Sequence, residues 1–242
     1  MTTESCKRWT TTFLAFVACF QMSAGVSWAG HPDEHVIPRH GERKAGGIVL
    51  PARAKVHGHS LAEVARRVAA FNVTDHSGTP PELPFQMLYT TATNTFEVGK
   101  RDFFYVPVWQ NDDSYPAVGQ YPNVSDRAAV LNYLNSQDEF GLVESVIVVD
   151  GKEYDLDTDY VAAVKLKHPL TDFLPPATAG GKQYMTVAAF LSPMRRGTHT
   201  VEIRGLATGD AIAPWSQVLH EVLGIDPFTE MSFSITYTVN VH

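Results

Sequence analysis

Two histidines and a glutamate stand together at His57-x-His59-x3-Glu63, a spacing that suits metal binding. Neutral imidazoles and a carboxylate are ligands that iron, manganese and zinc accept. Glu63 also has a structural interpretation, because Ser60 three residues earlier completes the S-x-x-E capping box of a helix. The sequence therefore leaves two alternatives here, a transition-metal site and a plain helix start.

The same three residues resemble the core of the first cupin metal motif, in which an HxH pair and a following Glu hold one divalent ion. This resemblance implies a metal-dependent enzyme on a jelly-roll scaffold. Two cupin glycines are missing, because Pro51 and Ala70 occupy their positions, and the segment 193–199 matches a second cupin motif only superficially. We keep the metal-dependent enzyme as an alternative function.

Three aspartates alternate along the chain and indicate calcium: Asp155, Asp157 and Asp159. They do not form an EF-hand, because Tyr160 replaces the required glycine and Leu166 replaces the bidentate glutamate. On an extended strand their carboxylates share one face about 6.6 Å apart, too far for one ion unless the chain bends. Asp112 and Asp113 would complete a composite Ca²⁺ site between loops, with solvated acidic turns as the alternative.

The long loop 112–122, with the sequence DDSYPAVGQYP, is the best candidate for ligand binding. Loops held by a rigid scaffold often carry binding residues. The candidate ligand-binding residues are Asp112, Asp113, Tyr115 and Tyr121. We expect the two tyrosines to be exposed, as in a glycan-binding surface, and Trp109 and Trp215 to lie in the core.

Nucleophilic catalysis has little support in this chain. No G-x-S-x-G elbow is present, and both cysteines, Cys6 and Cys19, fall within the first 29 residues. His199 shares one face of an alternating segment with Val201 and Ile203, so we expect it to be a hydrogen-bonded core residue. The sequence thus favours a protein that is not an enzyme, without deciding the matter.

The first 29 residues have the features of a secretory signal peptide. Lys7 and Arg8 precede the apolar run 13–20. Ser27 and Ala29 place small residues at the two positions that a signal peptidase reads, which favours cleavage after Ala29. Lipidation at Cys19 is a minor alternative, and the apolar run is too short for a membrane anchor. We predict an exported protein, periplasmic or secreted, with no transmembrane segment in the mature chain.

Composition limits the partners of the mature chain. Without residues 1–29, 17 basic and 25 acidic residues remain, a net charge of −8. An acidic surface argues against nucleic acid as a partner. Residues 30–54, rich in His, Pro and Gly, are expected to be a flexible lead-in whose histidines leave metal capture open. Residues 55–242 are expected to form a single domain of unknown oligomeric state.

The pattern of the remaining chain predicts strands. The segment 102–109 is almost continuously apolar, which is typical of a strand covered on both faces, and 232–241 alternates with period two. Asp150-Gly151 between two apolar segments predicts a hairpin. One helix is expected after Ser60, and two short helices at 125–135 and 214–223. We predict an antiparallel β-sandwich, immunoglobulin-like or jelly roll.

Four segments carry a resemblance across most of the mature chain: GHSLAE at 58–63, FFYVPV at 103–108, VDGKEYDL at 149–156 and AAFLSPMRRGTHTVEIRG at 188–205. Together they resemble a group of uncharacterised exported bacterial proteins, and the last segment is similar to the C-terminal hairpin of bacterial immunoglobulin-like modules. The resemblance implies export and the sandwich fold, and it gives no information about activity.

From these observations we expect an exported, non-enzymatic binding or interaction protein whose partner is a glycan, a surface component or another subunit. The metal-dependent enzyme is the first alternative, and a structural protein of the cell envelope is the second. The cofactor remains unknown, with Ca²⁺ preferred over a divalent transition metal.

Overall fold

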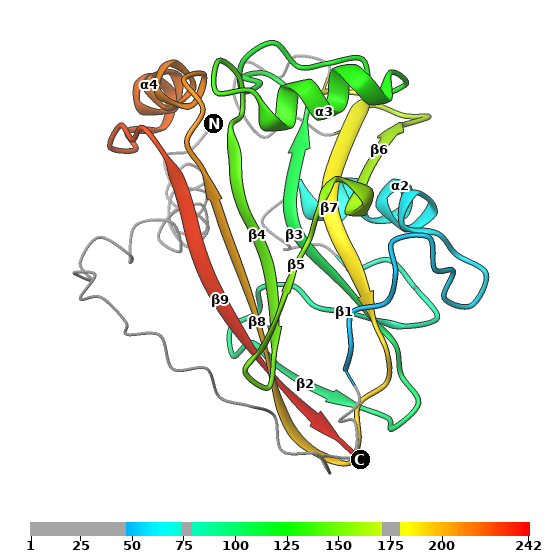
Figure 1. Ribbon diagram of the computed structural model, residues 1–242. Coiled ribbons are helices and arrows are strands. Elements are labelled where there is room, and N and C mark those ends of the chain that lie inside the picture. The colour runs from blue at the N-terminus through cyan, green and yellow to red at the C-terminus, as the bar shows by residue number, and fades with distance from the viewer. Residues whose placement is uncertain (1–46, 74–78, 171–179) are drawn as a thin grey trace, which may run out of the picture.

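Two β-sheets packed face to face form the core of the protein (Figure 1). The computed structural model describes residues 47–73, 79–170 and 180–242. The four-stranded sheet has the order β1 (Gln86–Met87), β3 (Phe104–Asp112), β7 (Gln183–Leu191), β6 (Val161–Lys165). The five-stranded sheet has the order β2 (Thr95–Val98), β9 (Met231–Val241), β8 (Gly197–Ala207), β4 (Leu142–Val149), β5 (Lys152–Asp155).

The sheets are mixed, which corrects the prediction of a purely antiparallel sandwich. β1 pairs with β3 in parallel, and β2 pairs with β9 in parallel, while the other strand pairs are antiparallel. Parallel neighbours need a crossover connection. Between β1 and β3 the chain crosses to β2 in the other sheet, so β3 enters in the same direction as β1. Single-strand patterns do not contain this information.

The four-stranded sheet is covered on both faces, as the apolar run at 102–109 predicts. On β3, Tyr105 packs with the helix side of the sheet, whereas Phe104 and Val106 pack between the two sheets. The helix on the outer face is α2 (Leu61–Asn72), which lies against β6 and β7. The protein is therefore layered as helix, sheet and sheet.

The capping box predicted for α2 is present. The Ser60 backbone N–H donates to Glu63 Oε2 at 2.7 Å, and the Glu63 N–H donates to Ser60 Oγ at 3.3 Å. The Ser60 hydrogen bonds lower the pKa of Glu63, the backbone N–H first and the hydroxyl second. The prediction of a helix start at this point is confirmed.

Three further helical segments connect the strands: α3 (Arg127–Asn135), the 3-10 turn η1 (Thr158–Tyr160) and α4 (Ile212–Leu223). α3 lies across one end of the sandwich (Figure 1) and buries Val130, Tyr133 and Leu134. The helix predicted at 125–135 is present, and its N-cap is Asp126, because Asp126 Oδ1 accepts from two backbone N–H groups of the first turn.

The Asp150-Gly151 hairpin joins β4 to β5 as predicted. Both residues have positive φ, 49° and 81°, which is the requirement of a two-residue type I′ turn. Val149 and Lys152 are the strand residues that face each other across it. This turn fixes the register of β5 at the edge of the five-stranded sheet.

The described chain begins with a segment held against the end of β7. The Leu50 N–H donates to the Phe190 carbonyl at 2.8 Å, and the Ser192 N–H donates to the Ile48 carbonyl at 3.0 Å. Packed structure therefore starts before residue 55. The predicted signal peptide, Cys19 and residues 30–46 of the lead-in lie outside the described residues. No helix in the described ranges is long and apolar enough to cross a bilayer.

Candidate functional site

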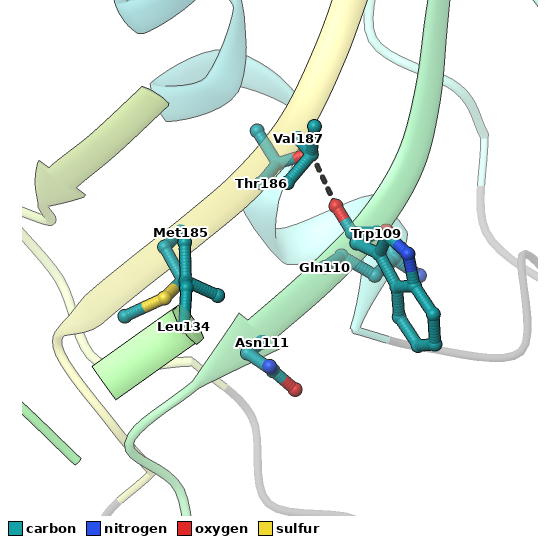
Figure 2. Close-up of a pocket in the computed structure, with 7 residues that line it drawn as sticks. All are labelled: Trp109, Gln110, Asn111, Leu134, Met185, Thr186 and Val187. Carbon is teal, nitrogen blue, oxygen red and sulfur yellow. Dashed lines mark hydrogen bonds between the residues drawn. The ribbon is translucent and has the colours of Figure 1, made fainter. Parts of the chain in front are cut away.

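Two hollows lie side by side beneath α3, and the first of them is closed. Figure 2 shows its lining, formed by Trp109, Gln110, Asn111, Leu134, Met185, Thr186 and Val187. Thr186 Oγ1 donates to the Trp109 carbonyl at 2.6 Å across it. Its free volume is about 0 Å³, so this closed crevice admits no ligand.

The second hollow, here called the side cavity, has a volume of about 240 Å³. It shares Leu134 and Val187 with the closed crevice. Its lining comes from α3, β4, the β5–β6 connection, β6 and β7: Leu134, Asn135, Leu142, Val143, Ser145, Leu156, Asp157, Thr158, Val161 and Val187. The side cavity therefore enters the sandwich where β4 and β5 of one sheet meet β6 and β7 of the other.

A β-bulge in β4 shapes the mouth of the side cavity. Leu142 pairs with Ala207 and Glu144 with Leu206, so Val143 is an extra residue without a partner in the ladder. A bulge re-aims the side chains next to it. Leu142 packs against the inter-sheet core, while Val143 is left 62% exposed at the cavity wall.

The floor of the side cavity is apolar, and the one serine of its lining has a buried hydroxyl. Leu134, Leu156, Val161 and Val187 are all buried there. Ser145 is 6% exposed, and its Oγ has no hydrogen-bond partner among the described residues. An unsatisfied buried hydroxyl costs about 1–3 kcal/mol. This residue is the feature of the site that most requires an explanation.

The rim of the side cavity is polar and exposed, with Asn135, Asp157 and Thr158 around the mouth. Arg127 of α3 stabilises this rim through two hydrogen bonds. Arg127 donates from Nη1 to the Val161 carbonyl at 2.8 Å and from Nη2 to the Thr158 carbonyl. These bonds fix η1 to α3 and hold the mouth in place.

The predicted histidine–glutamate site does not assemble in this geometry. Glu63 is engaged in the capping box, His57 lies edge-on to Phe103, and His59 lies edge-on to Phe85. In the ranges 47–73, 79–170 and 180–242, no group of three or more His, Cys, Asp or Glu side chains is arranged to hold a metal ion.

The three aspartates of the predicted calcium site have separate tasks. Asp155 pairs with Val146 at the end of β5. Asp157 is the N-cap of η1, and its Oδ1 accepts from the Asp159 N–H at 2.8 Å. All three are exposed, and Asp157 reaches the rim of the side cavity.

The acidic half of the 112–122 loop is occupied in local structure. Asp113 accepts from the Gln183 N–H at 2.7 Å and from Gln183 Nε2 at 3.0 Å. Asp112 Oδ1 accepts from the Ser114 N–H at 2.8 Å, which forms a turn. These bonds anchor the start of the loop to β7 instead of leaving both carboxylates free for a ligand.

The two tyrosines of that loop differ. Tyr115 is 62% exposed, as expected. Tyr121 is half-buried, which corrects the expectation, because its ring packs on Tyr133 and its hydroxyl donates to the Asn111 carbonyl at 3.0 Å. Burial and then the charge of Asp112 raise the pKa of Tyr121 well above its usual value. Trp109 is buried and Trp215 half-buried, each with its indole N–H bonded to a carbonyl.

His199 is hydrogen-bonded at both ring nitrogens, and its side chain is 11% exposed. Nδ1 lies 2.7 Å from Asp150 Oδ2, and Nε2 lies 2.8 Å from the Arg195 carbonyl. Both partners accept, so the protonated ring satisfies both contacts. Burial lowers the pKa of His199, but the hydrogen bonds to Asp150 and Arg195 and the charge of Asp150 raise it above the usual value overall.

The side cavity is not among the features that the sequence predicts. One signal was available, because Ser145 interrupts the otherwise apolar end of the strand LVESVIVV. A small polar residue on a buried strand face either finds a partner or lines a space. Which of the two holds depends on residues from α3, β6 and β7, which local patterns do not bring together.

Comparison with known proteins identifies no family for this chain. No family model matches it. No curated protein matches it either. Among solved structures the chain is similar to the solution structure of amebosin, with 12% identity, a TM-score of 0.25, and coverage of 66% of this chain and 100% of that one.

Proposed function

We propose that this chain is an exported, non-enzymatic binding protein that takes a small molecule into the side cavity. The observation that carries the proposal is the 240 Å³ of space between the sheets, with an apolar floor and a polar rim. The 1–29 segment supports export, to the periplasm or beyond. The finer fold assignment, immunoglobulin-like or jelly roll, stays a prediction.

The size of the side cavity limits the ligand. An apolar cavity of about 150 Å³ in a protein core binds benzene, whereas drug-sized ligands occupy roughly 300–1,000 Å³. The 240 Å³ here therefore suits one ring with a short substituent. An oligosaccharide would have to bind elsewhere.

A fragment screen tests this proposal directly. Single-ring fragments are added to protein with labelled Val and Leu methyl groups, and methyl shifts are recorded by NMR. Binding in the side cavity shifts Val143, Leu156 and Val187, which line it. A panel that shifts none of these methyl groups would refute the proposal.

A matched pair of variants locates the binding. Ser145→Leu adds volume to the cavity floor and should abolish the methyl shifts. Ser234→Leu makes the same change at an exposed position of β9, away from the cavity lining, and should leave them intact. Equal loss in both variants would show that the shifts do not report on the side cavity.

A glycan or other surface component is a second candidate ligand, and the exposure of Tyr115 favours it. Aromatic side chains present an apolar face on which a sugar ring can stack. Glycan arrays probed with the wild type and with Tyr115→Ala test this candidate. If the Tyr115→Ala variant binds the same glycans as the wild type, Tyr115 does not take part in glycan binding.

Export is tested separately by N-terminal sequencing of the protein recovered outside the cytoplasm. Cleavage after Ala29 yields a mature chain beginning at Gly30. A lipid-modified chain beginning at Cys19 would instead establish the alternative anchor. A chain recovered uncleaved in the cytoplasm would contradict export.

A further inference from the structure

We infer that the outer face of helix α2, together with the two chain segments beside it, binds an acidic polysaccharide. Seven exposed cationic side chains form this surface, which we call the basic face: Arg53, Lys55, Arg66, Arg67, Lys165, Lys167 and Lys182. α2 lies on the outer side of the four-stranded sheet (Figure 1), whereas the side cavity lies between the two sheets. The inference therefore concerns a second binding surface and does not depend on the side cavity.

The helix contributes charge to this surface and keeps its apolar side hidden. That side packs onto the sheet, with Leu61, Val64 and Val68 buried. Arg66 and Arg67 lie on the side away from the sheet, and both are exposed. Two guanidinium groups therefore face solvent over the middle of α2.

Arg53 and Lys55 lie near the start of α2. Their neighbour Val56 packs in the same apolar cluster as the helix. The pKa of Glu63 is lowered first by its hydrogen bonds with Ser60 and also by the charge of Lys55. Lys55 therefore lies close to the first turn of the helix.

Three lysines lie near the end of α2. Asn72 Nδ2 donates to the Tyr184 hydroxyl at 3.0 Å, which joins the last residue of the helix to the start of β7. The Leu166 N–H donates to the Lys182 carbonyl at 2.7 Å, so the lysines on either side of Leu166 lie close to Lys182. The seven cations thus border the helix at both ends and along its outer side.

Charge is distributed unevenly over the molecule. In residues 47–73, 161–170 and 180–184, seven side chains are basic and one, Glu63, is acidic, whereas residues 91–160 carry 13 acidic and 4 basic side chains. Among the described residues none of the seven cations forms an ion pair, while Arg204 on the other sheet is paired with Glu144 and Glu153. The negative net charge of the chain therefore does not extend to the basic face, which attracts anions.

The surroundings of the basic face favour a polysaccharide over a membrane or a nucleic acid. Peripheral helices insert an apolar side into lipid, and that side of α2 is buried against the sheet. Single-stranded nucleic acids stack their bases on aromatic rings, but the exposed aromatic ring of the described residues, Tyr115, lies outside the basic face. A polysaccharide needs neither feature, because its spaced anionic groups can pair with separate cations.

Dextran sulfate and dextran are matched probes, because they share a backbone and differ in charge. Each is titrated into the protein, with Kd taken from biolayer interferometry. Dextran sulfate should bind in about 50 mM NaCl and at least tenfold more weakly in about 200 mM NaCl, because salt screens the cations and opposes counterion release. Dextran should not bind at either salt concentration.

Two pairs of adjacent exposed arginines locate the binding. Arg66→Glu with Arg67→Glu reverses the charge at the centre of the basic face and should weaken dextran sulfate binding at least tenfold. Arg195→Glu with Arg196→Glu makes the same change in net charge on the β7–β8 connection and should weaken it less than about threefold. Arg66→Gln with Arg67→Gln should give a smaller loss, and it keeps the test valid if the Glu variant does not fold.

Three outcomes would overturn the inference. Equal weakening by the two arginine pairs would show that net charge, and not the basic face, decides binding. Failure of dextran sulfate to bind at low salt would remove the ligand. Tighter binding to phosphatidylserine vesicles or to duplex DNA would show that the partner is not a polysaccharide. None of these outcomes touches the proposed function, because neither Arg66 nor Arg67 lines the side cavity.

Discussion

The two hollows beneath α3 are each bordered by a β-bulge, and they differ in whether a large side chain fills the space. In β3 the extra residue is Val108, between Pro107 and Trp109, and it is 7% exposed. In β4 the extra residue is Val143, and it is 62% exposed. The same backbone irregularity thus gives a closed crevice in one strand and an open cavity in the other.

Aromatic packing explains the closed side. Trp109 makes edge contacts with Phe140 and Phe233, at ring-centroid distances of 5.3 and 4.9 Å. Gly205 makes room for it, because a Cβ there would come within 2.6 Å of both the Phe233 ring and the Trp109 indole. At the other bulge, Ser145 and Val143 are too small to fill the space. Residue volume, and not strand geometry, decides which bulge becomes a site.

The largest effect is expected from Trp109→Ala. Removing a buried aromatic costs about 3–5 kcal/mol of unfolding free energy. Trp109 Nε1 also donates to the Glu144 carbonyl at 2.9 Å, so the substitution frees a carbonyl at the second bulge. Urea unfolding measures the loss, with Tyr115→Ala as an exposed aromatic control that should stay within about 0.5 kcal/mol. Similar losses in both variants would contradict the claim that packing of the Trp109 ring stabilises this side of the core.

The matched pair Val108→Ala and Val143→Ala separates the two bulges directly. Val108→Ala should cost about 1.5–2 kcal/mol of unfolding free energy, because two buried carbons are lost. Val143→Ala should change it by less than about 0.5 kcal/mol, because the side chain is already exposed. The midpoints of urea unfolding measure both values. Equal costs would show that the bulge in β4 is closed in solution.

Filling the open side should stabilise the protein. Ser145→Val removes the unpartnered hydroxyl, adds apolar volume to the floor and introduces a residue that favours strands. We expect a gain of about 1 kcal/mol in unfolding free energy together with weaker fragment binding. A loss of stability measured by urea unfolding would show that Ser145 Oγ has a structural partner after all.

The smallest expected effect on stability concerns the end of β4 opposite the bulge. Hydrogen bonds hold this end in place, whereas the bulged end borders the side cavity. His199 and Asp150 join β8 to the β4–β5 turn, and the Thr200 N–H donates to Asp150 Oδ1 at 3.0 Å. Because the pKa of His199 is raised in the folded state, its contribution is complete below the unfolded pKa of about 6.5. The contribution is lost as pH rises through the folded pKa.

Urea midpoints between pH 5.5 and 8.5 should therefore fall more steeply for the wild type than for His199→Gln. Hydrogen exchange of the Thr200 amide should accelerate over the same range beyond its intrinsic pH dependence. Parallel pH profiles for the two proteins would show that the His199–Asp150 contact makes no charge-dependent contribution to stability.

Features set by neighbouring residues could be predicted from the sequence. The Ser60–Glu63 capping box, the Asp150-Gly151 turn and the doubly covered strand at 102–109 are all local patterns, and the structure contains each of them. Such signals depend on backbone hydrogen bonds and periodicity within a few residues.

Features set by distant residues could not be predicted. The parallel edges depend on which sheet the chain enters, and the side cavity depends on four elements meeting at Leu134 and Val187. The Pro- and Gly-rich loop predicts an exposed Tyr121, but Tyr133 from α3 packs on its ring. In each case the deciding contact comes from another part of the chain.

The place of β9 has a consequence for how the chain folds. β9 lies between β2 and β8, and Asn240 Nδ2 bonds to Glu97 Oε1 across 143 residues. Strand pairings of such long range are slow to form, because the entropy of closing a large loop is lost before the stabilising contacts are made. β2 has no partner in its sheet until residues 231–241 are available. The five-stranded sheet therefore reaches its full width only after the chain from residue 95 to residue 241 has been synthesised.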